Sequence, residues 1–181
     1  GAKAAISGGV ALTLDVRDEA AVEQAMAGLD PVDILVNSAG ILQNPVAPGE
    51  LSMAEWDRVV AVDLRGTYVM CRAVGTAMNE RGGGAIVNIA SVAGVNSAPV
   101  HAYGPAKAGV ISLTRSLAAQ WGRAGVRVNA VSPGFTRTQA VERSFALGAL
   151  SEDAVTGSTA LGRLLEADEV AAAVLFLASP L

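Results

Sequence analysis

Short apolar runs alternate along this chain with longer segments of helical periodicity. The runs at residues 11–16, 34–37, 85–90 and 127–132 predict strands, and helical patterns cover residues 19–29, 53–78, 103–123 and 166–177. Continuous apolar runs are typical of strands buried on both faces of a parallel sheet, whose crossover connections are usually helical. The alternation therefore predicts an α/β protein with a doubly wound parallel sheet.

The chain length and composition fit a single domain. With 181 residues, 51% of them hydrophobic, we expect one domain over residues 1–181, with the tail of a helix and a turn at 1–9 and an irregular segment at 136–163. Asp18 and Ser52 are expected helix N-caps. Ligands of such sheets bind at the carboxyl ends of the strands. Four features lie at those ends: Asp15, the turn after Asn37, Ser91 and the turn at Pro133.

Charge and composition exclude several classes of function. The net charge is −4 and the basic residues are scattered, which argues against nucleic acid as a partner. One cysteine, Cys71, excludes an intrachain disulfide, and a single histidine with a single cysteine makes zinc binding an unfavoured interpretation. No apolar run has the length that spans a bilayer, and residues 1–9 do not resemble a signal peptide. We expect a cytoplasmic protein without a membrane partner.

Tyr103 and Lys107 are the most informative pair in the sequence. Residues four apart share one face of a helix, so the phenol and the ammonium can approach a common ligand. Moving a tyrosine pKa from about 10 to about 7 takes roughly 4 kcal/mol, and one positive charge at about 4 Å supplies a similar amount at an effective dielectric near 20. The pair predicts a tuned acid or base, with Ser91 donating a hydrogen bond to the same substrate oxygen. The alternative is a solvated helix face with a snorkelling lysine.

Ordered motifs extend beyond this pair. They are LDV at 14–16, NSAG at 37–40, NIAS at 88–91, YGPAK at 103–107, RVNAVSPG at 127–134 and LGRLLEADEVAAAVLFLAS at 161–179. In this order and spacing they resemble the short-chain dehydrogenase/reductase family, of the ordinary rather than the extended type. The resemblance implies a Rossmann-like fold with three α/β/α layers and an oxidoreductase that uses NAD or NADP.

The resemblance also implies roles for individual residues. Tyr103 would be the acid or base, Lys107 would bind the nicotinamide ribose and lower the tyrosine pKa, and Ser91 would polarise the substrate oxygen. The other implied cofactor-binding residues are Asp15, Val16, Asn37, Ala39, Gly40, Pro133, Gly134, Thr136 and Thr138. For Asp15 the alternative is a strand-end carboxylate near a helix start, and NSAG read alone is any small-residue turn.

The chain departs from the family pattern at three positions. Asp63 stands where the family often has an asparagine that completes a proton relay, and we predict that Asp63 is catalytic. Thr136 stands where an aliphatic residue is usual. His101 is interpreted as a solvated loop histidine, with contact to substrate as the alternative.

A strand, a Gly-rich phosphate turn and a helix open the family's fold, and nothing in this sequence supplies them. Gly8–Gly9 and Gly82–Gly84 precede strands and cannot cradle a phosphate. We expect a fragment that omits this unit and the last strand. The strand at 11–16 would then have no neighbour, and one edge of the strand at 34–37 would be exposed.

The favoured function is interconversion of a secondary alcohol or polyol and its ketone, or reduction of a 3-oxoacyl group. The alternatives are a non-catalytic dinucleotide-binding or interaction protein and, less favoured, an extended-family epimerase or dehydratase. Small or apolar residues dominate the segments at 92–101 and 139–159, which favours a small neutral substrate. The resemblance implies a homotetramer, or a homodimer.

Overall fold

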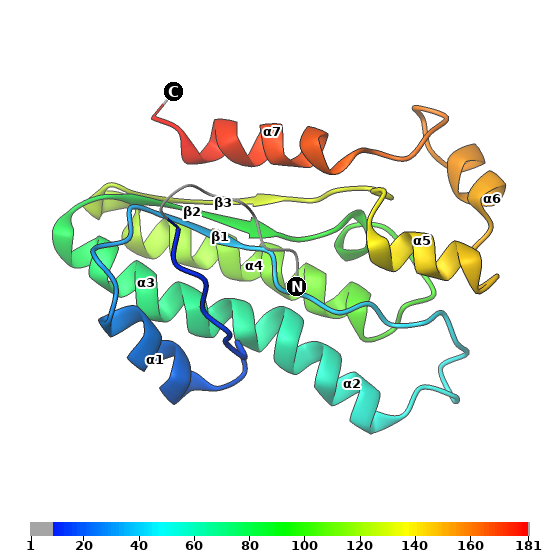
Figure 1. Cartoon of the computed structure of the whole chain (residues 1–181), viewed down its shortest axis with the longest axis horizontal. Coiled ribbons are helices and arrows are strands. Elements are labelled where there is room, and N and C mark those ends of the chain that lie inside the picture. The colour runs from blue at the N-terminus through cyan, green and yellow to red at the C-terminus, as the bar shows by residue number, and fades with distance from the viewer. Residues whose placement is uncertain (1–8, 181) are drawn as a thin grey trace.

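Three parallel strands form the centre of the molecule. The computed structural model describes residues 9–180. Strands β1 (Ile34–Asn37), β2 (Gly84–Ile89) and β3 (Val126–Val131) pair in the order β1-β2-β3, in a register that sets Asn37 beside Asn88. Helix α7 (Ala167–Ala178) lies along one face of the sheet, and α3 (Thr67–Arg81) and α4 (Tyr103–Trp121) lie along the other (Figure 1). This arrangement confirms the predicted Rossmann-like α/β fold.

The remaining helices lie around this sandwich. They are α1 (Glu19–Ala27), α2 (Met53–Val60), α5 (Gln139–Ala146) and α6 (Glu152–Gly157), and a π-helical turn (Ala61–Gly66) joins α2 to α3 without a break. Short 3₁₀ turns occur at Val92–Gly94 and Gly122–Ala124. The Asp18 side chain caps α1 and the Ser52 side chain caps α2, as predicted.

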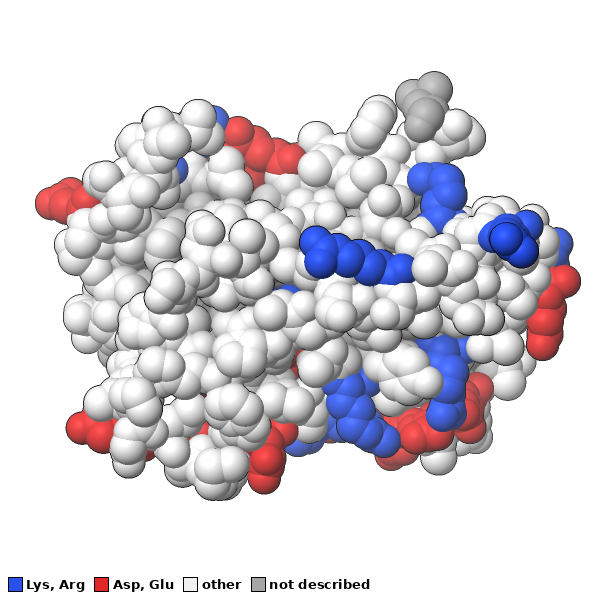
Figure 2. All heavy atoms as spheres, turned by 180° about the vertical axis from the view of Figure 1, so that it is seen from behind, with Lys and Arg blue, Asp and Glu red and all other residues white. Residues whose placement is uncertain are grey.

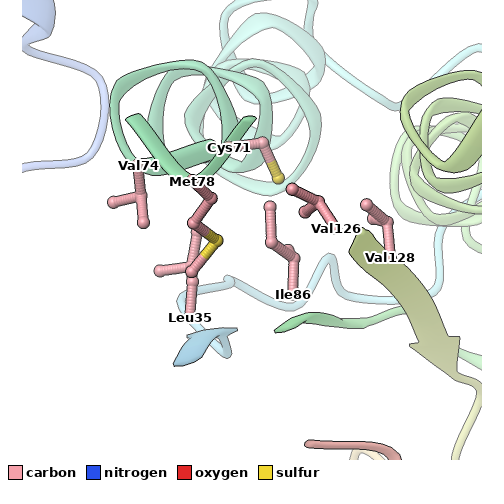
Figure 3. Packing of buried hydrophobic residues seen from close by; sticks show 7 residues of the cluster. All are labelled: Leu35, Cys71, Val74, Met78, Ile86, Val126 and Val128. Atoms are coloured by element: carbon pink, nitrogen blue, oxygen red, sulfur yellow. The ribbon is translucent and has the colours of Figure 1, made fainter. Parts of the chain in front are cut away.

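The main core lies between α3 and the sheet. In Figure 3, the side chains of α3 point onto apolar residues of all three strands. A stripe of α3 at helical spacing therefore meets strand residues that point to the same face of the sheet. The cluster consists of Leu35, Cys71, Val74, Met78, Ile86, Val126 and Val128.

Two elements differ from the sequence prediction. Residues 9–15 have no regular secondary structure, so the strand predicted at 11–16 is wrong. Without a ladder partner in the described part of the chain, this segment cannot satisfy strand hydrogen bonds. As expected for an edge, β1 leaves Ile34 51% and Val36 43% exposed. The segment at 136–163, predicted to be irregular, contains α5 and α6, which pack around Val141, Val155 and Leu164.

The prediction for residues 1–9 falls outside the described residues except for Gly9. Within residues 9–180, none of the helices combines the length and the apolar character needed to cross a bilayer. Charged side chains are sparse on the face seen in Figure 2, where broad areas are uncharged and several basic groups lie beside acidic ones.

Candidate active site

Ser91 and Tyr103 are brought together at the carboxyl end of β2. Ser91 lies two residues beyond Ile89, and its Oγ accepts a hydrogen bond from Ala93 N at 3.2 Å. The turn that follows packs directly on α4, because a Cβ added to Gly94 would lie 2.7 Å from Ala108 N. This close approach brings the Ser91 hydroxyl near enough to the Tyr103 phenol to favour a lower phenol pKa. The predicted convergence of these two side chains is therefore present.

Lys107 lies beneath Tyr103 and is 4% exposed. Its Nζ donates to the carbonyl of Ile89 at 2.9 Å and lies 5.5 Å from the centre of the Tyr103 ring. The same Nζ lies 3.5 Å from Asp63 Oδ2. Burial lowers the pKa of Lys107, and the Asp63 carboxylate acts in the opposite direction. The lysine is therefore a fixed internal group rather than a solvated one.

Asp63 is fully buried and comes from the π-helical turn. Its Oδ1 accepts from Ile41 N at 2.8 Å, whereas Oδ2 has no hydrogen-bond partner among the described residues and only the ion pair with Lys107. Burial raises the pKa of Asp63, while Lys107 and the Ile41 amide oppose the rise. π-helical turns inside α-helices are frequent at functional sites. The structure places Asp63 in the same cluster as Ser91, Tyr103 and Lys107.

The pKa of Tyr103 differs in direction from the sequence expectation. Burial raises it, the Ser91 hydroxyl lowers it, and the Asp63 carboxylate raises it further, with a net rise above the ordinary value. The expected lowering by Lys107 rested on an isolated positive charge about 4 Å away. In the structure the lysine charge is paired with Asp63. The carboxylate therefore offsets the lysine in its effect on the phenol.

A second part of the site is a cavity of about 590 Å³ beside β1. Four of the predicted cofactor-binding residues line it, namely Asp15, Val16, Ala39 and Gly40, and Arg58 also contributes. Arg17 Nη2 lies 2.6 Å from Asp15 Oδ2, and this hydrogen-bonded pair lowers the pKa of Asp15 to about 2. Gly40 joins the cavity to the catalytic cluster, because a Cβ there would lie 3.3 Å from Asp63 Oδ2 and 3.5 Å from Lys107 Nζ.

Asn37, also predicted to bind the cofactor, points into the interior instead. Its Nδ2 donates to Asn88 Oδ1 at 2.8 Å, and Asn88 Nδ2 donates to Thr114 Oγ1 at 3.0 Å. These buried amides tie β1 to β2 and β2 to α4. Asn37 therefore supports the turn at Ala39 and Gly40 from below and does not line the cavity.

The loop after β3 contributes the last predicted group. The carbonyl of Pro133 accepts from Val92 N at 3.0 Å, which joins this loop to the Ser91 turn, and Gly134 follows directly. Thr136 Oγ1 donates to the carbonyl of Gly134 at 3.1 Å. The Thr138 hydroxyl caps α5 by accepting from Val141 N. Pro133 and Gly134 thus lie beside the catalytic cluster, while both threonine side chains hold the local loop.

His101 is half-buried and lines a separate cavity of about 410 Å³ between the 93–101 segment and α4.

Sequence reasoning missed one residue near the site, Gln43, which hydrogen-bonds to the start of α4. Only its position shortly after NSAG could have signalled it. No group of three or more His, Cys, Asp or Glu side chains within the described ranges is arranged to hold a metal ion.

Comparisons with known proteins agree with this geometry. A family model described as enoyl-(acyl carrier protein) reductase matches residues 2–181. D-threitol dehydrogenase of Mycolicibacterium smegmatis is 44% identical over 171 residues, which cover 91% of this chain and 64% of that protein. The chain therefore spans somewhat less than two thirds of the length of this relative.

Two solved structures are also similar. A Brucella melitensis protein described as ribose-5-phosphate isomerase has 55% identity and a TM-score of 0.92, covering 95% of this chain and 68% of that one. A gluconate 5-dehydrogenase of Burkholderia cenocepacia, in complex with NADP and tartrate, has 33% identity and a TM-score of 0.84, covering 92% and 66%.

The fold and the site define a parallel α/β protein with a Ser, Tyr and Lys cluster at the carboxyl edge of its sheet. The chain belongs to the short-chain dehydrogenase/reductase family.

Proposed function

We propose that the protein is an NAD(P)-dependent oxidoreductase that interconverts a secondary alcohol or polyol and its ketone. The observation that carries the proposal is the convergence of Ser91, Tyr103 and Lys107 at the end of β2. A protein that only binds a dinucleotide has no need of all three groups. The threitol and gluconate dehydrogenases among its relatives support a polyol or sugar acid as the substrate class. Reduction of a 3-oxoacyl group uses the same chemistry.

The residues present fit a nicotinamide dinucleotide in part. The cavity at Asp15, Val16, Ala39 and Gly40 also has Arg58 in its lining, and its volume of about 590 Å³ has room for an adenosine. Pro133 and Gly134 would hold the nicotinamide end beside Ser91. When bound, nicotinamide supplies a two-electron hydride acceptor or donor.

The protein's own groups handle the proton and the substrate oxygen. In alcohol oxidation Tyr103, as phenolate, accepts the hydroxyl proton, and a nicotinamide held beside Ser91 would supply the acceptor for the carbinol hydride. The Ser91 hydroxyl donates a hydrogen bond to the oxygen that becomes the ketone. Lys107 holds positive charge beneath the tyrosine, anchored by the carbonyl of Ile89. In ketone reduction Tyr103 returns the proton.

The test is turnover measured at the nicotinamide absorbance with a panel of polyols, sugar acids and ketones, using the full-length protein. Tyr103→Phe should lose at least about a hundredfold in kcat, within the range for general acid–base catalysis. Tyr68→Phe is the matched control, because Tyr68 is the only other tyrosine and is 44% exposed. Equal rates for the two variants would favour the alternative of a non-catalytic binding or interaction protein.

One further assay tests for isomerase activity, because the Brucella relative is described as an isomerase. Isomerisation of ribose 5-phosphate needs no net hydride exchange with a nicotinamide, so it would proceed without added NAD(P). The segment after Ser91 carries no arginine cluster to receive a phosphate. We expect no isomerase activity, and cofactor-independent turnover that survives Tyr103→Phe would overturn the proposal.

We also propose a cytoplasmic homotetramer, or a homodimer. The exposed apolar side chains of α7, Leu175 and Phe176, are 71% and 63% exposed and would be covered in an assembly. The single buried cysteine is compatible with a reducing compartment. Light scattering of the full-length protein measures the number of subunits, and a monomer at micromolar concentration would rule out both assemblies.

A further inference from the structure

Gln43 makes an unusual long-range contact with the start of the helix that carries Tyr103. It lies in the connection between β1 and α2 and is 4% exposed. Its Oε1 accepts a hydrogen bond from Ala102 N at 2.7 Å and one from Tyr103 N at 3.3 Å. A single side-chain oxygen, some 60 residues away in sequence, thus satisfies two backbone donors at the helix start.

This contact fills a need that the helix cannot meet by itself. The first N–H groups of an α-helix have no partner within the helix, and a side-chain oxygen at the N-cap usually accepts one of them. The N-cap residue of α4 is Ala102, which has no such oxygen. Gln43 takes that place from another element, so the first turn of α4 is fixed against the segment that contains Gln43.

The same segment is also joined to the other members of the cluster. Ile41 N donates to Asp63 Oδ1, and Gly40 packs closely on both Asp63 Oδ2 and Lys107 Nζ. Residues 40–43 therefore contact the start of α4 at one end and, at the other, Asp63 and the Lys107 ammonium one turn further along α4. The position of the phenol relative to Asp63 therefore depends on this short connection.

Apolar packing does not account for the amide group of Gln43. Its Nε2 is buried and has no hydrogen-bond partner in the part of the chain that the structure describes. An unpaired buried donor is destabilising, and an apolar side chain of similar size would avoid that cost. The two hydrogen bonds to the start of α4 are what the amide contributes at this position.

We propose that Gln43 is a positioning residue that holds Tyr103 in place relative to Asp63 and Ser91. The inference rests on the proposed function and assigns to it a residue that contacts neither the phenol nor the lysine through its own side chain. Small displacements of a catalytic group have large effects on rate, of the order of a hundredfold for about 1 Å. Loss of the Gln43 acceptor should therefore reduce kcat while binding of substrate changes little.

The experiment compares three variants of the full-length protein in alcohol oxidation. Gln43→Met keeps the size and removes the acceptor, Gln43→Glu keeps an acceptor for both N–H groups, and Thr114→Val is the matched control. Thr114 lies on the same helix and also accepts a buried hydrogen bond from another element, Asn88, but eleven residues beyond Tyr103. Rates are compared at the plateau of each pH profile, since a carboxylate near Tyr103 also shifts the profile itself.

Gln43→Met should lower kcat by about ten- to a hundredfold with KM within about twofold. Gln43→Glu should recover most of the rate, and Thr114→Val should lower the melting temperature with kcat nearly unchanged. If Gln43→Met lowers only the melting temperature, as Thr114→Val does, the residue is purely structural and the inference is wrong. The proposed function fails separately, when the wild-type protein turns over no alcohol or ketone, or when Tyr103→Phe is as active as wild type.

Discussion

Replacing Asp63 by asparagine tests whether a buried carboxylate controls the ionisation of Tyr103. In the structure Asp63 carries its charge next to Lys107 and raises the pKa of the phenol. Asparagine keeps the shape and an acceptor for Ile41 N but removes the charge. The pKa of Tyr103 should fall, so phenolate forms at lower pH. The acidic limb of the oxidation profile should then move to lower pH.

The structure sets the size of the effect. Asp63 Oδ2 lies 3.5 Å from Lys107 Nζ, which lies 5.5 Å from the centre of the Tyr103 ring, so the carboxylate is within about 9 Å of that centre. At about 9 Å and an effective dielectric near 20, one charge contributes about 1.8 kcal/mol, or about 1.3 pKa units. We therefore expect a shift of about one unit.

The measurement is the pH dependence of kcat/KM for alcohol oxidation, which reports groups of the free enzyme. Asp57→Asn serves as the charge-matched control, since Asp57 is exposed on α2 and should leave the profile unchanged. An unshifted limb in Asp63→Asn would mean that Asp63 is uncharged in the working range, which refutes the ion pair. A shift to higher pH would mean that Asp63 mainly keeps Lys107 protonated, which refutes the assigned sign.

Three further predictions concern packing and burial. Met78→Ala should destabilise the fold by about 2–5 kcal/mol, measured by denaturant unfolding, because Met78 is fully buried between α3 and the sheet. Gly94→Ala should lower both stability and kcat, because its Cβ would meet the backbone of α4 at 2.7 Å, whereas Gly49→Ala, with open space around it, should not. Cys71 should resist alkylation at pH 8 in the native protein and react after denaturation, because it is fully buried and burial raises its pKa to about 12; rapid native labelling would contradict the packing of α3.

The cluster of Ser91, Tyr103 and Lys107 was predictable because its geometry follows from local rules. Tyr103 and Lys107 share a helix face through their spacing of four residues, and Ser91 follows a strand whose end is clear in the sequence. A parallel sheet then brings such strand ends to one edge. For the same reason the turn at Ala39 and Gly40 lies at this edge, where it lines the cavity.

The features that were not predictable depend on contacts between distant elements. Gln43 reaches α4 through a loop whose path no sequence rule fixes. The π-helical turn that carries Asp63 leaves the helical pattern of residues 53–78 intact, so periodicity alone did not show it. The segment at 11–16 has the composition of a strand, but a strand forms only where a neighbour supplies hydrogen bonds. In this segment the tertiary context outweighs the strand propensity of the residues.

Two buried polar atoms, Asp63 Oδ2 and Gln43 Nε2, have no hydrogen-bond partner among the described residues. Asp63 contacts one end of the short connection at residues 40–43, and Gln43 is its other end. Unpaired buried groups cost stability and call for a reason other than packing. In each side chain the second polar atom, an oxygen, accepts from backbone amides: Asp63 Oδ1 from Ile41 N, and Gln43 Oε1 from Ala102 N and Tyr103 N. The connection thus fixes Tyr103 and Asp63 relative to each other at a cost in stability. It follows that Asp63→Asn and Gln43→Met should be non-additive in kcat, because each alters the geometry through which the other acts.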